Sequence, residues 1–244
     1  IAHDWLKKKN IAVERLQGGY KGFRSYIVSQ HSDTKSYNKS WKVIGGLTGS
    51  GKTQLLNQFN EAIDLEKIAN HRGSAFGKNI SEQPSQANFE NIITDKYLNH
   101  RPPQIYIEDE SRTIGRVTLP ESWYGKMQRS DLIVLKISNE KRVNNILKEY
   151  VHEALRDFTN ENELLKQYLY SLDKIKKRLG GELYKNISSL MIEAFNKNKN
   201  HEDWISKLLM SYYDPMYKYK LSMRKKYIIH IGDYKSCYEY LGGP

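Results

Sequence analysis

The most chemically specific stretch of the sequence is a glycine-rich run that ends in a lysine and a threonine. Residues 46–53 read Gly-Leu-Thr-Gly-Ser-Gly-Lys-Thr and fit the Walker A pattern G-x-x-x-x-G-K-[ST]. In this motif backbone amides surround phosphate oxygens, the lysine adds a mobile cation and the final hydroxyl is placed to bind Mg²⁺. The sequence therefore predicts a site for a diphosphate or triphosphate. The predicted phosphate-binding residues are Gly46, Thr48, Gly49, Ser50, Gly51, Lys52 and Thr53.

Acidic residues supply a second part of this predicted site. Glu108, Asp109 and Glu110 stand at the end of an apolar run that is typical of a strand. In P-loop proteins the acid that ends this strand holds Mg²⁺ or orients a nucleophile. We expect Asp109 or Glu108 to do this, and Thr53 with Asp109 as the candidate Mg²⁺ ligands. Three adjacent acids repel one another, so a cation should lie close by.

Polar clusters that contain arginine follow two of the predicted strands. One cluster covers residues 71–74, and the other covers residues 111–116. Strand exits in an α/β sheet open on one crevice, and an arginine fork matches two phosphate oxygens. These clusters are therefore expected to face the phosphate loop. The arginines concerned are Arg72, Arg112 and Arg116.

A parallel sheet with helices between its strands has to position these residues. Strands that alternate with helices favour a doubly wound α/β fold of the P-loop NTPase type. The predicted strands are residues 41–45, 62–63, 104–108, 132–137 and 227–231, and helices are predicted from about residue 51 and over 88–97. Between residues 140 and 226 the apolar spacing becomes helical, and one of these helices is expected to end near Asp214–Pro215.

The chain divides by pattern into five segments. Residues 1–29 read as a helix, a short strand at 11–16, a Gly-Gly turn and a short helix, and are too few to fold alone. A polar stretch without periodicity at 30–40 is predicted to be a linker. The remaining segments are a P-loop α/β core at 41–139, a basic helical segment at 140–226, and the last strand with a terminal helix at 227–244.

The charge balance favours a polyanionic partner. The chain has 39 basic and 28 acidic residues, a net charge of +11, and 13 of its 18 tyrosines lie after residue 123. Basic groups mixed with aromatic rings suit RNA, although an AT-rich genome produces a similar composition. Lys176, Lys177 and Arg178 are the candidate tRNA contacts, with a solvated helix end as the alternative.

Other compositional features restrict the class of protein. No apolar run is long enough to span a membrane, and the given residues show no secretory h-region behind a basic start, so no membrane partner is expected. The single cysteine, Cys237, excludes an internal disulfide and a multi-thiolate metal site, and is expected to be buried and inert on a short terminal helix. These features predict a cytoplasmic protein, and no protein partner is predicted.

Several motifs, taken in order, resemble the tRNA 2-selenouridine synthase family. They are GLTGSGKT at 46–53, DLEKIANHRGSAFG at 64–77, QPSQANFEN at 83–91, IEDESRTIGRVTLP at 107–120 and YYDPMY at 212–217. The opening WLKKKNIAVERLQGGYKGFR, residues 5–24, also resembles the close of that family's rhodanese domain. Residues 1–29 are therefore expected to be the C-terminal remnant of a rhodanese-like domain.

The resemblance implies a transferase that modifies 2-thiouridine at the wobble position in the anticodon of tRNA. Its co-substrates would be geranyl diphosphate, which places a geranyl group on the sulfur, and selenophosphate, whose selenium then replaces that sulfur to give 2-selenouridine. Mg²⁺ is a candidate cofactor. The implied catalytic residues are Lys52, Asp109, Arg72, Arg112 and Arg116, and the implied substrate-binding residues are His71, Ser74, Glu110 and Ser111.

Two features depart from the family pattern. The family uses a rhodanese-loop cysteine in the selenium step, which would lie upstream of this chain, and Cys237 stands at the wrong end to replace it. Ten residues separate Thr53 from Asp64, fewer than in the family. A helix with its return strand needs at least about 10–12 residues, so this connection is barely long enough.

Two other functions remain open at the level of sequence. The Walker A motif does not distinguish a prenyl diphosphate from ATP or GTP, so a P-loop kinase or NTPase that acts on a small molecule is one alternative. Steady ATP turnover without tRNA would favour it. The other alternative is an RNA-binding module without catalysis, which would bind tRNA tightly and leave the wobble base unchanged.

Overall fold

The computed structural model describes residues 2–32, 39–60, 62–158, 160–196 and 200–243. Its regular helices are α1 (Ala2–Lys8), α2 (Gly19–Ser32), α3 (Lys52–Leu56), α4 (Leu65–Ala69), α5 (Gln86–Asn99), α6 (Glu121–Gln128), α7 (Asn139–Leu147), α8 (Glu161–Leu179), α9 (Gly181–Asn196), α10 (Glu202–Leu208), α11 (Asp214–Met223) and α12 (Tyr234–Tyr240). Shorter or wider helical turns are η1 (Lys148–Glu153), η2 (Ala154–Arg156), η3 (Leu209–Tyr213) and η4 (Lys225–Tyr227).

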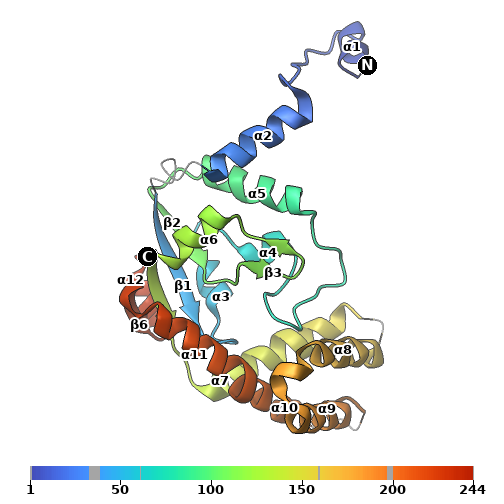
Figure 1. The fold of residues 1–244 in the computed structure, drawn as a ribbon, viewed down its shortest axis with the longest axis vertical. Coiled ribbons are helices and arrows are strands. Elements are labelled where there is room, and N and C mark those ends of the chain that lie inside the picture. The colour runs from blue at the N-terminus through green and yellow to red at the C-terminus, as the bar shows by residue number, and fades with distance from the viewer. Residues whose placement is uncertain (1, 33–38, 61, 159, 197–199, 244) are drawn as a thin grey trace.

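A parallel sheet of four strands forms the centre of the molecule (Figure 1). In spatial order the strands are β2 (Gln104–Glu108), β1 (Ser40–Gly46), β5 (Asp131–Leu135) and β6 (Ile228–Gly232). Val43 in β1 lies between Ile107 and Leu132 of its two neighbours. Because β1 and β5 are covered on both faces, their residues are mostly apolar. The predicted α/β fold class is confirmed.

The predicted second strand is reduced to one residue. Ile63 forms an isolated parallel bridge to Ile107 at the outer side of β2. The helix before it, α3, has only five residues. The short connection from Thr53 to Asp64 therefore contains one short helix and a single bridge residue at the edge of the sheet. A small hairpin of β3 (Thr113–Ile114) and β4 (Val117–Thr118) follows β2.

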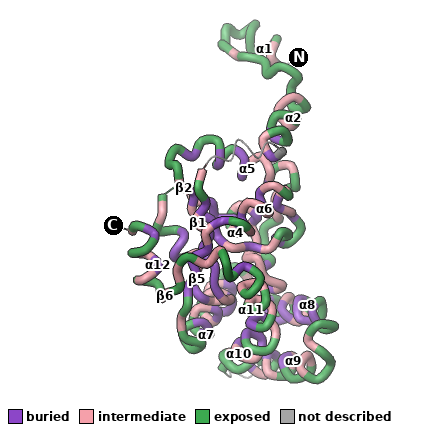
Figure 2. Tube along the Cα trace, turned by 60° about the vertical axis from the view of Figure 1, so that its left-hand side comes forward, coloured by how far each residue is buried: buried purple, intermediate pink, exposed green. Residues whose placement is uncertain are grey.

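The core has separate parts on the sheet and in the helical segment (Figure 2). One face of the sheet packs around Trp41 and Trp123, whose rings meet edge to face at 5.1 Å. The other face is covered by α3 and α12, where Cys237 is fully buried as expected. The helical segment encloses its own cluster, which includes Tyr168 and Trp204. Each part therefore buries its own apolar residues.

Helices α7–α11 fill the interval between β5 and β6, as predicted. The expected end near Asp214–Pro215 is wrong, because the chain continues through η3 directly into α11. Proline lies in the first turn of α11, directly after the wider helical turn η3. This continuity carries α11 back across the sheet (Figure 1).

The N-terminal residues differ from the predicted pattern. Residues 11–16 form no strand, and α2 is a helix of 14 residues that packs against α5. Arg24 contacts Glu90, and His31 is buried with its ring nitrogen 2.6 Å from the Thr94 hydroxyl. The predicted linker is therefore wrong over residues 30–32, which end α2, while residues 33–38 lie outside the described residues.

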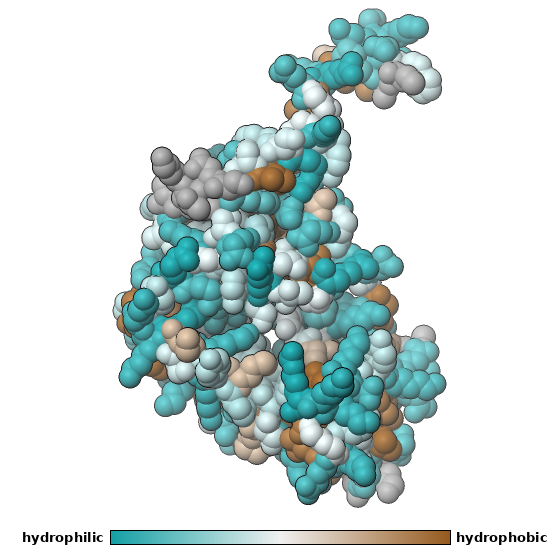
Figure 3. Space-filling model, in the orientation of Figure 1, coloured by the Kyte–Doolittle hydropathy of each residue, from teal (hydrophilic) through white to brown (hydrophobic). Residues whose placement is uncertain are grey.

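The outer surface turned to the viewer in Figure 3 is mostly hydrophilic, with small scattered apolar areas. Within the described ranges, no helix combines the length and the apolar character needed to cross a membrane.

Candidate functional site

The phosphate loop runs from the end of β1 to the start of α3 and is held from outside by α7. The Arg142 side chain donates from Nε to the Thr48 carbonyl at 2.8 Å, and the Asn145 amide donates to the Gly49 carbonyl at 2.9 Å. Gly49 has φ +78°, and a Cβ there would stand 2.8 Å from the Arg142 carbonyl oxygen. A glycine is needed at this position because α7 approaches so closely.

Lys52 stands at the edge of a cavity of about 280 Å³ beside this loop. Its ammonium donates to the Gly46 carbonyl at 3.4 Å and lies 5.6 Å from the centre of the Tyr217 ring. The predicted site residues that line the cavity are Thr48, Gly49, Gly51, Lys52, Thr53, Arg72, Ser74 and Glu110. Ser50 is buried, and Gly46 ends the strand below the cavity.

Three glutamates meet below the cavity. Carboxylate oxygens of Glu66, Glu108 and Glu110 lie within 4.8 Å of one another. The Thr53 hydroxyl donates to Glu108 at 3.2 Å, and the backbone amide of Glu66 donates to its other oxygen at 3.0 Å. Gly73 has φ +60°, and a Cβ there would stand 2.5 Å from Glu66 and 2.7 Å from Glu110. The chain passes so closely over the carboxylates that only glycine fits.

Burial and mutual repulsion favour the protonated forms of these acids. The pKa of Glu66 is raised to about 10, first by burial and then by the charges of Glu108 and Glu110. Burial also raises the pKa of Glu108, Glu110 and Glu149. Mg²⁺ takes oxygen ligands, which the three carboxylates and the Thr53 hydroxyl supply. The residues present therefore fit a divalent cation.

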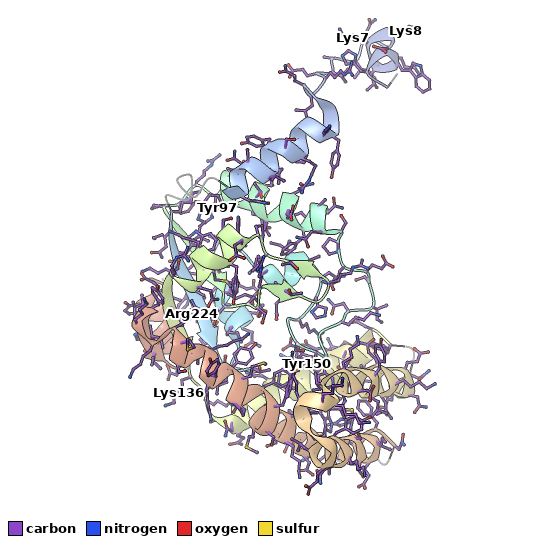
Figure 4. All side chains as sticks on the ribbon, viewed as in Figure 1. Lys7, Lys8, Tyr97, Lys136, Tyr150 and Arg224 are labelled. Atoms are coloured by element: carbon purple, nitrogen blue, oxygen red, sulfur yellow. The ribbon has the colours of Figure 1, made fainter. Side chains whose placement is uncertain are left out.

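Asp109 occupies a different place from the one predicted. Its carboxylate pairs with the guanidinium of Arg224, the residue that follows α11, and the two side chains are only 13% and 7% exposed. Asp109 lines a neighbouring cavity of about 190 Å³, which shares Glu110 and Tyr217 with the phosphate-loop cavity. Figure 4 shows Arg224 at the end of α11, beside the sheet. Of the two predicted acids, Glu108 and not Asp109 contacts Thr53.

The predicted arginines separate into one that lines the cavity and two that do not. Arg72 donates to the Glu149 carbonyl at 3.0 Å, and its guanidinium lies 5.1 Å from the centre of the Tyr150 ring. Arg112 pairs with Glu121, and Arg116 is exposed on the hairpin. Both side chains are exposed and pair with surface glutamates, so the three arginines do not share the phosphate-loop cavity.

The remaining predicted substrate residues are also divided. The Ser74 hydroxyl lies 2.9 Å from the Tyr150 hydroxyl at the cavity. The backbone of His71 instead forms an isolated antiparallel β-bridge with Lys78, and burial lowers the pKa of the His71 ring. Ser111 accepts a hydrogen bond from Lys220 at 2.9 Å on the side of the neighbouring cavity.

Comparison with known proteins identifies the family of the chain. Residues 39–243 match the family model described as the tRNA 2-selenouridine synthase AAA domain. The chain is 40% identical to the tRNA 2-selenouridine synthases of Shewanella oneidensis and Shewanella sp. strain MR-7, over 99% of its own length and 68% and 69% of theirs. It belongs to the tRNA 2-selenouridine synthase family. No solved structure matches the chain.

In this member of the tRNA 2-selenouridine synthase family, the helical segment contributes residues that sequence reasoning missed. Glu149 and Tyr150 of η1 form one wall of the cavity, and Figure 4 shows Tyr150 where the sheet meets the helices. The motif YYDPMY supplies Asp214, whose carboxylate binds both terminal nitrogens of Arg142. It also supplies Tyr217 beside Lys52. The YYDPMY motif pointed to these residues in the sequence, but the residue types alone do not reveal which side chains they contact.

The predicted tRNA contacts lie apart from this cavity. Lys176, Lys177 and Arg178 are exposed in the last turn of α8. The Lys176 ammonium lies 4.7 Å from the centre of the Tyr184 ring on α9. The structure places the three charges together on the outside of the helical segment, and none of these three residues lines the phosphate-loop cavity.

Proposed function

We propose that this protein acts on tRNA that carries 2-thiouridine at the wobble position, first transferring a geranyl group from geranyl diphosphate to the sulfur. Selenium from selenophosphate then replaces the geranylated sulfur. Membership of the family supports tRNA as the substrate. The observation that carries the proposal is a phosphate loop whose Lys52 and Thr53 border one cavity with a cluster of glutamates.

The first step is a displacement at carbon. The sulfur of 2-thiouridine forms a bond to C1 of the geranyl group while the C1–O bond breaks, and diphosphate leaves with the electron pair. The uracil ring loses its N3 proton. Negative charge grows on the leaving oxygens, where the loop amides and Lys52 stabilise it most strongly in the transition state. Arg72, on the opposite wall of the cavity, adds a second cation.

A divalent cation has a defined place in this proposal. Glu66, Glu108 and Glu110 would hold Mg²⁺ together with the Thr53 hydroxyl, and the ion would neutralise charge on the diphosphate. Its presence would also relieve the repulsion among the three carboxylates. Thr53 and Glu108 replace the predicted pair of Thr53 and Asp109, because Asp109 is engaged by Arg224.

The second step needs another phosphate-containing substrate. The loop that holds diphosphate also suits the phosphate of selenophosphate once diphosphate has left. Selenium forms a bond to C2 of the base, the geranyl thiol leaves, and water takes the phosphoryl group. Cys237 has no part in this step, because it is fully buried between the sheet and α12 and burial raises the pKa of its thiol.

Mass analysis of the modified tRNA tests this function. We would incubate 2-thiouridine tRNA with the protein and geranyl diphosphate, then add selenophosphate, and compare this chain with a full-length relative. Gain of one geranyl group on the wobble nucleoside is expected, followed by exchange of sulfur for selenium. Unmodified tRNA with both proteins would overturn the proposal. Steady ATP turnover without tRNA would instead support a small-molecule kinase or NTPase.

A further inference from the structure

A second, apolar opening lies in the wall of the phosphate-loop cavity. It shares Thr48, Ser74, Ile146 and Tyr150 with that cavity. Its far side consists of side chains from α10 and η3, namely Trp204, Ile205, Leu208, Leu209 and Tyr213. Its accessible lining is apolar throughout. We call this opening the side slot.

The shape of the side slot restricts what it admits. It contains about 340 Å³ of space that no protein atom fills, including its mouth, but only about 20 Å³ of this admits the centre of a water molecule. The slot is therefore small, and a tail that enters it has to move the side chains of its walls apart. Its apolar lining suits the end of a hydrocarbon chain better than a sugar or a hydrated charged group, each of which would lose hydrogen bonds to water there.

The position of the slot ties its occupant to the phosphate loop. Thr48 belongs to the loop itself, and Ile146 belongs to the helix that holds the loop. A ligand bound at the loop can therefore extend an apolar group from the cavity into the slot. A prenyl diphosphate has this form, with an anionic head and an apolar tail joined at one carbon.

We propose that the side slot receives the distal end of the prenyl tail and selects its length. This inference rests on the proposed function for the identity of the diphosphate. Leu208 and Leu209 line the slot but not the phosphate-loop cavity, and they act as specificity-determining residues. Trp204 and Ile205 support them from the core of the helical segment, where they are 3% and 1% exposed.

Prenyl diphosphates of three lengths test the assignment in variants that fill or enlarge the slot. Leu208→Phe fills the slot, and we expect the kcat/KM ratio of geranyl to dimethylallyl diphosphate to fall at least tenfold. Leu209→Ala enlarges it, and we expect the ratio of farnesyl to geranyl diphosphate to rise at least tenfold. Burial of about two methylene groups accounts for a tenfold change.

Matched variants at Leu172 control for general damage to the helical core. Leu172 is fully buried in the same cluster but does not line the slot. Leu172→Phe and Leu172→Ala should alter stability without changing either ratio. Selectivity that shifts equally in the Leu172 and slot variants, or in neither, would overturn the assignment.

Binding measurements separate the slot from the proposed reaction. The unaltered protein should bind geranyl diphosphate at least tenfold more tightly than inorganic diphosphate. Leu208→Phe should remove this difference and leave the affinity for inorganic diphosphate unchanged. If Leu208→Phe weakens the binding of geranyl diphosphate but no geranyl group is transferred to tRNA, the proposed reaction is refuted and the proposed role of the slot stands. Equal affinities for the two diphosphates, or transfer with unchanged selectivity, would refute the slot.

Discussion

The sheet and the helical segment contribute to the site in different ways. The sheet side presents ionisable groups at strand exits, where Thr53, Glu66 and Glu108 converge. The helical segment presents aromatic and apolar walls such as Tyr150 and Trp204. Strand exits meet because parallel strands share an edge, whereas the walls meet only after the helices have packed. In this molecule the chemistry comes from one region and the shape of the cavity from the other.

A buried ion pair inside the helical segment holds the arginine that contacts the phosphate loop. Asp214 of α11 binds Arg142 of α7, and Arg142 also donates to the Thr48 carbonyl in the phosphate loop. The paired side chains are only 2% and 6% exposed. Packing of the helical segment therefore sets the position of the loop, so the two regions are not independent.

Removal of the Lys52 ammonium should have the largest effect on geranyl transfer. It tests whether the reacting groups come from the sheet side. Lys52→Ala should slow geranyl transfer by about 10²–10³, similar to the loss of one donor that stabilises an oxyanion. Its tRNA affinity should stay within about twofold. Quench assays of transfer and filter binding of tRNA measure the two quantities. Lys67→Ala, at an exposed lysine, is the control, and unaltered transfer by Lys52→Ala would refute the diphosphate assignment.

Disruption of the ion pair tests the joint between the regions. Asp214→Asn should lower the free energy of unfolding by about 3–5 kcal/mol, because Arg142 then keeps a buried charge without its partner. Denaturant unfolding measures this change. The double variant Asp214→Asn with Arg142→Met should recover part of the loss. A cost below about 1 kcal/mol for the single variant would show that the pair does not stabilise the helices that hold Arg142 at the phosphate loop.

A combined pH and Mg²⁺ titration sharpens the role of the glutamate cluster. The pKa of Glu66 is about 10 in the folded protein against an ordinary value of 4.5. Between these values the folded state holds the extra proton, so stability should fall as pH rises. Mg²⁺ replaces that proton, so a fixed Mg²⁺ concentration should stabilise the protein more at high pH. At an Mg²⁺ concentration of 100 times Kd the free energy of unfolding should rise by about 2.7 kcal/mol, or roughly 5–10 °C in Tm.

The control for this titration uses two glutamine variants. Glu108→Gln should remove the Mg²⁺-dependent rise in Tm, and Glu182→Gln, at an exposed glutamate on α9, should keep it. Thermal unfolding over pH 5–9 measures both. A rise in Tm with Mg²⁺ that is equal in the two variants would place the cation elsewhere.

Neutralisation of the three basic residues at the end of α8 should have the smallest effect, and it tests a role of the helical segment in tRNA binding alone. Replacement of Lys176, Lys177 and Arg178 by Gln should weaken tRNA binding. The slope of log K against log salt should become shallower by about 2, because up to three phosphate contacts are lost. Affinity for geranyl diphosphate should not change. The matched variant neutralises Lys225, Lys226 and Lys235, and an unchanged slope for the first variant would remove the triplet from the interface.

Much of the fold was predictable from local pattern, and less of the site was. The strands β1, β2, β5 and β6 follow from apolar runs, since strands buried on both faces leave such runs. The predicted strand at residues 11–16 is wrong, because the alternating apolar residues there have no neighbouring strand to pair with. Arg112 and Arg116 misled because nearness in sequence to Glu110 does not determine which way a hairpin turns its side chains.

The local sequence alone determined the phosphate loop, because its glycines, Lys52 and Thr53 act within a single strand-to-helix turn. Tertiary structure decided which acid faces Thr53. Alternate residues of a strand point to opposite faces, so one step along the chain separates Glu108 at Thr53 from Asp109 at Arg224. Tertiary structure also decided the side slot, because its walls come from segments more than 100 residues apart that meet only when the helical core forms.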